Sequence, residues 1–214
     1  MGGILVVDYG MGNLGSILNM LRKVGVAAGL SQGPEDVLKA GKLILPGVGA
    51  FATAIGNLRA RGYVDALNRK VLAEKTPILG ICLGMQLFSK RSEEGGEPGL
   101  GWLDAQTVRF QFPAAGRQPK VPHMGWNSIR LLRESPLFPE AEDDRRFYFV
   151  HSFHMQCNDG RDVLARTFYG GEFTSAVCRG NIVGTQFHPE KSHRFGLAFF
   201  KAFAAWSPAA GPGV

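Results

Sequence analysis

Two periodicities of apolar residues alternate along the first half of the chain. Short, continuous apolar runs such as Ile4 to Val7 are typical of strands buried on both faces of a sheet. Between them, apolar residues recur at the i, i+3, i+4 and i+7 spacing of a helix. The predicted strands are 4–7, 26–30, 43–45 and 77–81. The predicted helices are 14–24, 35–39, 52–61, 64–74 and one that begins at about residue 84.

This alternation predicts an α/β fold with an open, mostly parallel sheet and helices on both faces. The second half instead carries additional, antiparallel strands with little helix, predicted at 106–112, 127–132, 147–152, 163–168, 174–178 and 182–187. Helical spacing returns between Phe195 and Trp206 and predicts a closing helix. We expect one domain over 1–206, an exposed loop at 113–119 and a frayed tail at 207–214.

Composition narrows the class of protein. The chain has 214 residues, 45% of them apolar, and a formal charge of +6, which suits one globular domain. The basic residues are scattered, so they permit an acidic partner surface without demanding nucleic acid. Three widely spaced cysteines make a poor disulfide framework and suit a reducing cytosol. We expect a cytoplasmic protein, because no apolar run is long enough to span a membrane and the start lacks the basic residues of a secretory signal.

The first candidate for chemistry is the segment Gly80-Ile81-Cys82-Leu83-Gly84, at a predicted strand-to-helix junction. This G-x-C-x-G spacing matches a nucleophile elbow, whose tight turn needs small residues on both flanks. The turn lifts the thiol to the edge of the sheet and places it at a helix N-terminus, which favours thiolate. A buried structural cysteine would be the simpler interpretation for a lone Cys, and it is the one we give Cys157 and Cys178.

The second candidate is His188 with Glu190, at the end of the predicted strand 182–187. Residues i and i+2 of an extended chain point to one side, and Pro189 favours extended backbone at His188. His188 can then face Cys82 as a base while Glu190 orients the ring, which is the logic of a catalytic triad. A surface His beside a surface Glu is the alternative, and the position at a strand end argues against it.

Two glycine-rich turns follow other strands. Pro46-Gly47-Val48-Gly49 could direct backbone N–H groups of Val48 and Gly49 towards a reacting carbonyl, and with the N–H of Leu83 complete an oxyanion hole. It could equally be a plain strand-to-helix turn. The segment 10–15 matches G-x-G-x-x-G, but the acidic residue of a dinucleotide site is not at the second strand end. We interpret it as a turn and a helix cap at Asn13.

Taken together, these motifs make the chain resemble the class I glutamine amidotransferases, and among them the glutaminase subunits of imidazole glycerol phosphate synthase. The resemblance covers about Ile4 to Phe203. The general family is carried by PGVG at 46–49, GICLGMQ at 80–86 and FHPEKS at 187–192. The narrower match is carried by DYGMGN at 8–13, PHMGWN at 122–127 and YFVHSF at 148–153. The one departure is the long loop at 114–119.

The resemblance implies a glutaminase that uses Cys82, His188 and Glu190 and passes through a thioester. It implies that ammonia goes to a (β/α)₈ cyclase partner in a heterodimer, for histidine biosynthesis. No metal or organic cofactor is implied. The implied substrate-binding residues are Gln86, Glu94, Tyr148 and Ser152. The implied partner-facing residues are Asn13, His123, Met124, Trp126 and Asn127.

Three alternatives remain at this point. Glutaminases for anthranilate, guanylate or pyridoxal phosphate synthesis share the chemistry, and PHMGWN with YFVHSF argues against them. A free cysteine hydrolase of γ-glutamyl peptides would need no partner and would show high basal turnover. A basic binding module with a degenerate site would not need Cys82, His188 and Glu190 intact.

Overall fold

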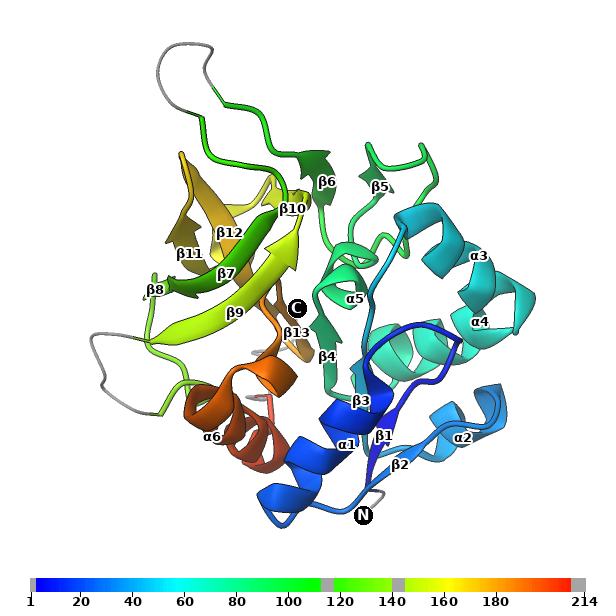
Figure 1. Ribbon diagram of the computed structural model, residues 1–214. Coiled ribbons are helices and arrows are strands. Elements are labelled where there is room, and N and C mark those ends of the chain that lie inside the picture. The colour runs from blue at the N-terminus through cyan, green and yellow to red at the C-terminus, as the bar shows by residue number, and fades with distance from the viewer. Residues whose placement is uncertain (1–2, 113–117, 140–144, 209–214) are drawn as a thin grey trace.

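The computed structural model describes residues 3–112, 118–139 and 145–208 (Figure 1). Within these residues, eight strands form one sheet in the order β2-β1-β3-β4-β13-β12-β11-β8. Pairing is parallel from β2 to β13 and antiparallel from β13 to β8. The strands are β1 (Ile4–Val6), β2 (Ala28–Leu30), β3 (Lys42–Leu45), β4 (Ile78–Ile81), β8 (Arg130–Leu131), β11 (Val163–Phe168), β12 (Glu172–Arg179) and β13 (Ile182–Thr185). The predicted fold class is confirmed.

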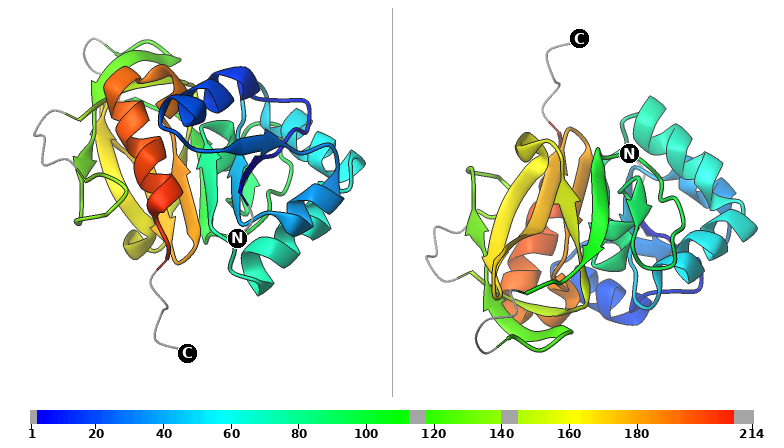
Figure 2. Two further views of the ribbon diagram at one scale, coloured as in Figure 1. Left: turned by 90° about the horizontal axis from the view of Figure 1, so that it is seen from below. Right: turned by 90° about the horizontal axis from the view of Figure 1, so that it is seen from above.

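Helices cover both faces of this sheet, as the two views of Figure 2 show. Side chains alternate between two cores, so that Ile44 of β3 packs into one and its neighbours Leu43 and Leu45 into the other. The first core is covered by α1 (Leu14–Lys23) and α6 (His193–Ala205). The second is covered by α2 (Pro34–Lys39), α3 (Phe51–Ala60), α4 (Tyr63–Asn68), the π-helical turn η1 (Arg69–Ala73) and α5 (Leu83–Gln86).

Two small sheets lie beside the central one. β10 (Phe153–Cys157), β6 (Ala105–Arg109) and β5 (Arg91–Ser92) form the first, and β7 (His123–Ser128) pairs with β9 (Arg146–His151) in the second. The predictions were wrong in detail here. The strand predicted at 127–132 is in fact β7, which begins at His123, followed by the short β8. β10 was missed because polar and apolar residues are mixed along it, with one of its five residues buried.

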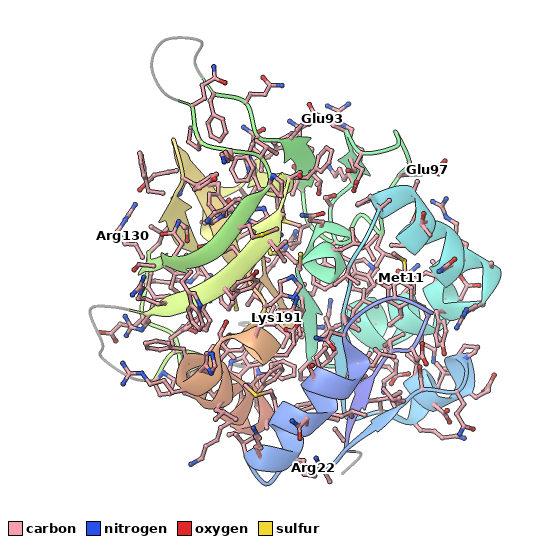
Figure 3. All side chains as sticks on the ribbon, in the orientation of Figure 1. Met11, Arg22, Glu93, Glu97, Arg130 and Lys191 are labelled. Carbon is pink, nitrogen blue, oxygen red and sulfur yellow. The ribbon has the colours of Figure 1, made fainter. Side chains whose placement is uncertain are left out.

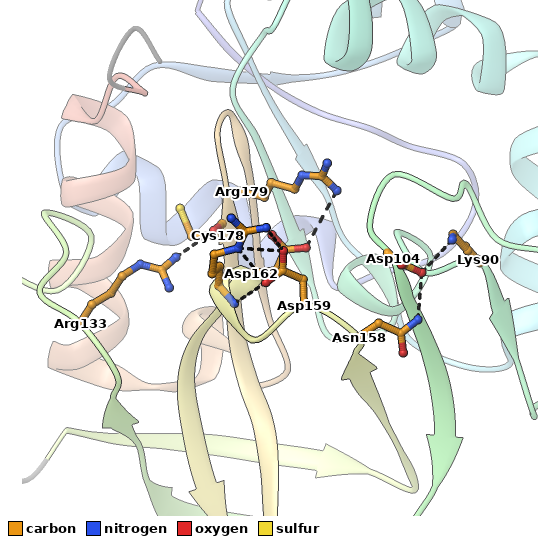
Figure 4. Close-up of polar contacts among 9 residues, drawn as sticks. Lys90, Asp104, Arg133, Asn158, Asp159, Asp162, Cys178 and Arg179 are labelled. Atoms are coloured by element: carbon orange, nitrogen blue, oxygen red, sulfur yellow. Dashed lines mark hydrogen bonds and ion pairs between the residues drawn. The ribbon is translucent and has the colours of Figure 1, made fainter. Parts of the chain in front are cut away.

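Polar contacts hold the edge of the sheet that is remote from the carboxyl ends of the parallel strands (Figure 4). Arg133 donates to the carbonyls of Val163 and Cys178, at 2.8 and 2.9 Å, and so ties the chain after β8 to β11 and β12. Asp104 pairs with Lys90 at 2.7 Å and accepts from Asn158 at 2.9 Å. These groups stabilise strand ends far from the candidate site described below.

Three further expectations concern the loop at 113–119, the C-terminal tail and membrane-spanning helices. Residues 113–117 of the predicted loop and 209–214 of the predicted tail lie outside the described residues, and the single-domain boundary at 206 stays a prediction. Among the helices of the described ranges, none is both long and apolar enough to cross a membrane.

One lysine fastens the closing helix to the sheet. The Lys42 ammonium group donates to the carbonyls of Phe203, Ala204 and Trp206 at 2.5–3.0 Å, where α6 ends and its carbonyls lack helical partners. The substitution Lys42→Met should therefore lower the free energy of unfolding by about 1–3 kcal/mol. Urea unfolding checks this value, with Lys201→Met on the exposed face of α6 as the control expected within about 0.5 kcal/mol of the parent. Equal stability of both variants would contradict the capping role.

Candidate active site

Cys82 occupies a strained turn between β4 and α5. Its backbone has φ 54° and ψ −109°, a region that residues with a side chain rarely adopt. The neighbouring glycines are required for space: a Cβ on Gly80 would meet the Met85 nitrogen at 2.7 Å, and one on Gly84 would overlap the Leu45 carbonyl. The predicted elbow is therefore present. Since α5 has four residues, its dipole contributes less to the sulfur than a long helix would.

The loop 46–49 packs directly on this turn. A Cβ on Gly47 would lie 2.6 Å from the Gly84 nitrogen, so the two backbones touch. A further layer supports the loop from behind, where a Cβ on Gly12 would lie 2.8 Å from Pro46. The buried hydroxyl of Tyr9 donates to the Pro46 carbonyl at 2.6 Å. The motifs 8–13, 46–49 and 80–84 therefore form one stack of backbone segments under the cavity.

His188 and Glu190 meet as predicted, but through a different backbone. His188 is extended, with φ −100° and ψ 96°, whereas Glu190 lies in a 3₁₀ turn, η3 (Pro189–Lys191), and not in a continued extended chain. Proline at the first position of the turn presets its φ and folds the carboxylate back. The His188 Nδ1 to Glu190 Oε1 distance is 2.7 Å, and both side chains are buried.

The protonation of His188 follows from its neighbours. Burial lowers the pKa of His188, but the Cys82 sulfur and the Glu190 carboxylate outweigh burial and raise this pKa to about 10. The Nε2 atom has no partner at full hydrogen-bond geometry, although the sulfur is near enough to act on its charge. Such contacts are often long before a substrate binds. The arrangement therefore favours a protonated His188 imidazolium beside the Cys82 sulfur.

A cavity of about 660 Å³ opens over these groups. Its lining includes the predicted Val48, Gly49, Cys82, Leu83, Gln86, Glu94, Ser152 and His188. The Glu94 carboxylate also accepts from the Phe51 nitrogen at 2.9 Å, at the start of α3. Tyr148 is not in the lining: its carbonyl accepts from the His188 nitrogen at 2.9 Å, and its ring lies near Lys191. Its role in substrate binding stays a prediction.

Two residues of the site were missed from the sequence. Gln186 is fully buried and donates to Cys82 Sγ at 3.6 Å. It directly precedes FHPEKS, and an amide at the end of a strand predicted to be buried was the signal that could have found it. Lys191 lines the cavity and lies at the middle of this face in Figure 3, between β9 and α1.

The predicted partner-facing residues divide into exposed and buried ones. Met124 and Trp126 are exposed to 62% and 41%, on the outer side of β7. His123 is buried, and Asn127 donates to the Phe168 carbonyl at 3.0 Å. Asn13 lines the cavity and stands at the N-cap of α1, but its side chain makes no capping hydrogen bond, so that expectation was wrong.

Comparison with known proteins finds similar sequences and structures. The family described as glutamine amidotransferase class-I matches residues 5–204. The chain is 50% identical to imidazole glycerol phosphate synthase subunit HisH 2 of Pseudomonas aeruginosa and, again at 50%, to that of Methanococcus maripaludis, each over 94% of this chain and 98% of the relative. A crystal structure of a glutamine amidotransferase matches with TM-score 0.71 and 25% identity, over 94% of this chain and 99% of the other.

The charge pairing at the site makes a prediction about pH. Alkylation of Cys82 by iodoacetamide should fall less steeply with decreasing pH in the parent than in His188→Asn, because the raised pKa of His188 keeps an imidazolium beside the sulfur up to about pH 10. In His188→Asn the rate should fall about tenfold per pH unit below the ordinary thiol pKa of about 8.5. Burial raises the pKa of Cys157 to about 12 and also raises that of Cys178, so both react slowly. A parent profile that falls like an ordinary thiol would contradict the pairing.

The backbone stack makes a prediction about packing. Gly84→Ala should lower the free energy of unfolding by about 1–3 kcal/mol, because the new methyl group pushes α5 away from Leu45. Gly56→Ala is the matched control: it lies inside α3 with open space around it and should raise stability by about 0.5–1 kcal/mol. Thermal unfolding of both variants checks the difference in sign.

Proposed function

This chain belongs to the class I glutamine amidotransferase family, among the HisH subunits of imidazole glycerol phosphate synthase, and on that premise we propose that it hydrolyses glutamine through Cys82, His188 and Glu190. The observation that carries the proposal is the orientation of the His188 ring. Its Nδ1 is fixed by Glu190 at 2.7 Å, and its Nε2 is left free in the cavity that contains Cys82. A base oriented in this way beside a nucleophile is what acyl transfer requires.

In the proposed reaction, Cys82 Sγ attacks the side-chain amide carbon of glutamine. The carbonyl electrons move to oxygen, and the backbone N–H groups of Leu83 and of the Val48–Gly49 loop stabilise the oxyanion. His188 Nε2 gives its proton to the departing nitrogen, the C–N bond breaks, and ammonia leaves. A γ-glutamyl thioester remains on Cys82. His188 then takes a proton from water as the water oxygen attacks, and the C–S bond breaks to release glutamate.

The substrate is proposed to bind along the cavity wall. Glu94 offers a carboxylate for the substrate ammonium group, and Gln86 and Ser152 offer polar atoms in the same lining. Tyr148 lies behind His188 and is proposed to fix the position of the base. The oxyanion donors carry the largest energetic effect, since loss of one typically costs about 10²–10³ in turnover.

Ammonia is proposed to pass to a cyclase subunit of (β/α)₈ fold, in a heterodimer. The exposed Met124 and Trp126 form an apolar surface on β7 that suits a partner protein. Asn127 on the same strand and Asn13, which lines the cavity at the start of α1, are proposed to face the same partner. The products in the partner are proposed to be imidazole glycerol phosphate and aminoimidazole carboxamide ribotide, in histidine biosynthesis.

The nucleophile is tested by Cys82→Ala, which should reduce glutamate release by at least about 10³-fold, because no other cysteine is among the described residues that line the cavity. Cys157→Ala and Cys178→Ala are matched controls and should keep the parent activity. Circular dichroism checks that each variant folds. Substantial glutaminase activity in Cys82→Ala would falsify the nucleophile assignment.

The partner is tested with the same assay in the presence of the cyclase barrel and its nucleotide ligand. Low basal glutamate release that rises strongly in the mixture is the expected result. Rapid glutamate release by the chain alone, unchanged when the barrel is added, would be compatible with the cysteine chemistry but would reject this acceptor pathway.

A further inference from the structure

A line of hydrogen bonds runs from the cavity wall to the sulfur of Cys82. The side-chain nitrogen of Gln86 donates to the Phe153 carbonyl at 2.9 Å and to the Gln186 side-chain oxygen at 3.1 Å. The side-chain nitrogen of Gln186 donates to Cys82 Sγ at 3.6 Å. Gln186 is fully buried one residue beyond β13. The sulfur therefore has a neutral amide donor in addition to the nearby imidazole.

The direction of this line is fixed by its first acceptor. A carbonyl oxygen can only accept, so the Gln86 atom that faces Phe153 is the amide nitrogen. That nitrogen needs an acceptor at Gln186, which therefore turns its oxygen to Gln86 and its NH₂ group to the sulfur. The Phe153 carbonyl is itself held, because it also accepts from Nδ1 of the buried His151 at 2.8 Å. Gln186 cannot flip without losing a buried hydrogen bond.

Other groups near the sulfur do not supply this donor. The Tyr9 hydroxyl is committed to the Pro46 carbonyl, and the Val150 carbonyl accepts from the thiol at 4.0 Å. His188, with Glu190 behind it, is the titratable pair that faces the sulfur. The proton of His188 must leave for the departing ammonia, whereas the N–H of Gln186 stays in place throughout.

We propose that Gln186 is a catalytic hydrogen-bond donor that stabilises negative charge on the Cys82 sulfur. The inference rests on the proposed role of Cys82 as the nucleophile. Charge is present on the sulfur before it attacks the amide, and it returns when the C–S bond of the thioester breaks and the electron pair goes to sulfur. A donor that remains aimed at the sulfur lowers the energy of both thiolate states.

The test compares two substitutions with a packing control. Gln186→Met keeps the length and removes the donor, and Gln186→Glu keeps the shape but places a carboxylate at the sulfur. Thr185→Val is the control, because Thr185 is buried next door and its hydroxyl donates to the Phe187 carbonyl. The measurements are Cys82 alkylation against pH, and kcat and KM for glutamine hydrolysis, on chains with parental thermal unfolding.

In Gln186→Met, alkylation at neutral pH should fall about tenfold and its profile should move to higher pH. The kcat should fall by at least as much, with KM changed less than about threefold. In Gln186→Glu the alkylation rate and kcat should fall further, because the carboxylate repels the thiolate. Thr185→Val should keep the parental alkylation profile and kcat. A lower kcat with an unchanged alkylation profile would assign Gln186 a packing role and overturn the inference. Parental kcat and a parental alkylation profile in the Gln186 variants would also overturn it.

If the Gln186 substitutions unfold the chain, the donor role of Gln186 can still be tested in the parent protein. The Gln186 side-chain amide resonance, assigned through its contacts to Gln86, should shift when Cys82 is alkylated, and an unchanged resonance would overturn the inference. Failure of the proposed function is a separate result: it appears as glutaminase activity in Cys82→Ala, whatever the Gln186 variants do.

Discussion

The close approach of three backbone segments at Cys82 is the constraint on which the site depends. Gly12 lies against Pro46, Gly47 against Gly84, and Cys82 itself is held at φ 54°. A side chain at any of these glycines would separate the layers. The strain at Cys82 persists because the start of the turn is held by the hydrogen bond from the Cys82 nitrogen to the Thr185 carbonyl at 2.7 Å, and its far end packs at Gly84 against Leu45.

This packing sets the electrostatics of the site. Because Cys82 and His188 are buried, water solvates a charge on sulfur or on imidazole only weakly, and burial alone would lower the pKa of His188. The opposite result arises because Glu190 and Cys82 lie on either side of the ring. The same burial acts unopposed on His123, where it lowers the pKa to about 4. At neutral pH, His188 is therefore protonated and His123 is neutral, because only His188 has negatively charged partners beside its ring.

The sequence predicted the parts of this molecule that local pattern determines. The apolar runs identified β1, β3 and β4, and the flanking glycines identified the elbow, because such a turn tolerates few other residues. The start of β7 and the whole of β10 were missed because their pairing partners are distant in the chain, His151 for His123 and Arg109 for Phe153, and neither segment has a continuous apolar run. The 3₁₀ turn at Glu190 escaped because extended and turned backbones both bring i and i+2 together. Gln186 escaped because a buried glutamine carries no motif of its own.

Two buried polar atoms of the site lack hydrogen-bond partners, which lowers the stability of the fold. His188 Nε2 and Glu190 Oε2 make no hydrogen bond, although a buried polar atom left unpaired typically costs about 1–3 kcal/mol. In the proposed reaction, Nε2 must alternately give and take a proton, and a permanent partner would compete with the substrate for that atom. Gln86 and Gln186 differ in this respect, because the Gln86 side-chain nitrogen and both polar side-chain atoms of Gln186 have hydrogen-bond partners in the line from Phe153 to the sulfur. The fold therefore fixes the amide groups that contact the sulfur, whereas His188 Nε2, the atom proposed to transfer protons, has no permanent partner.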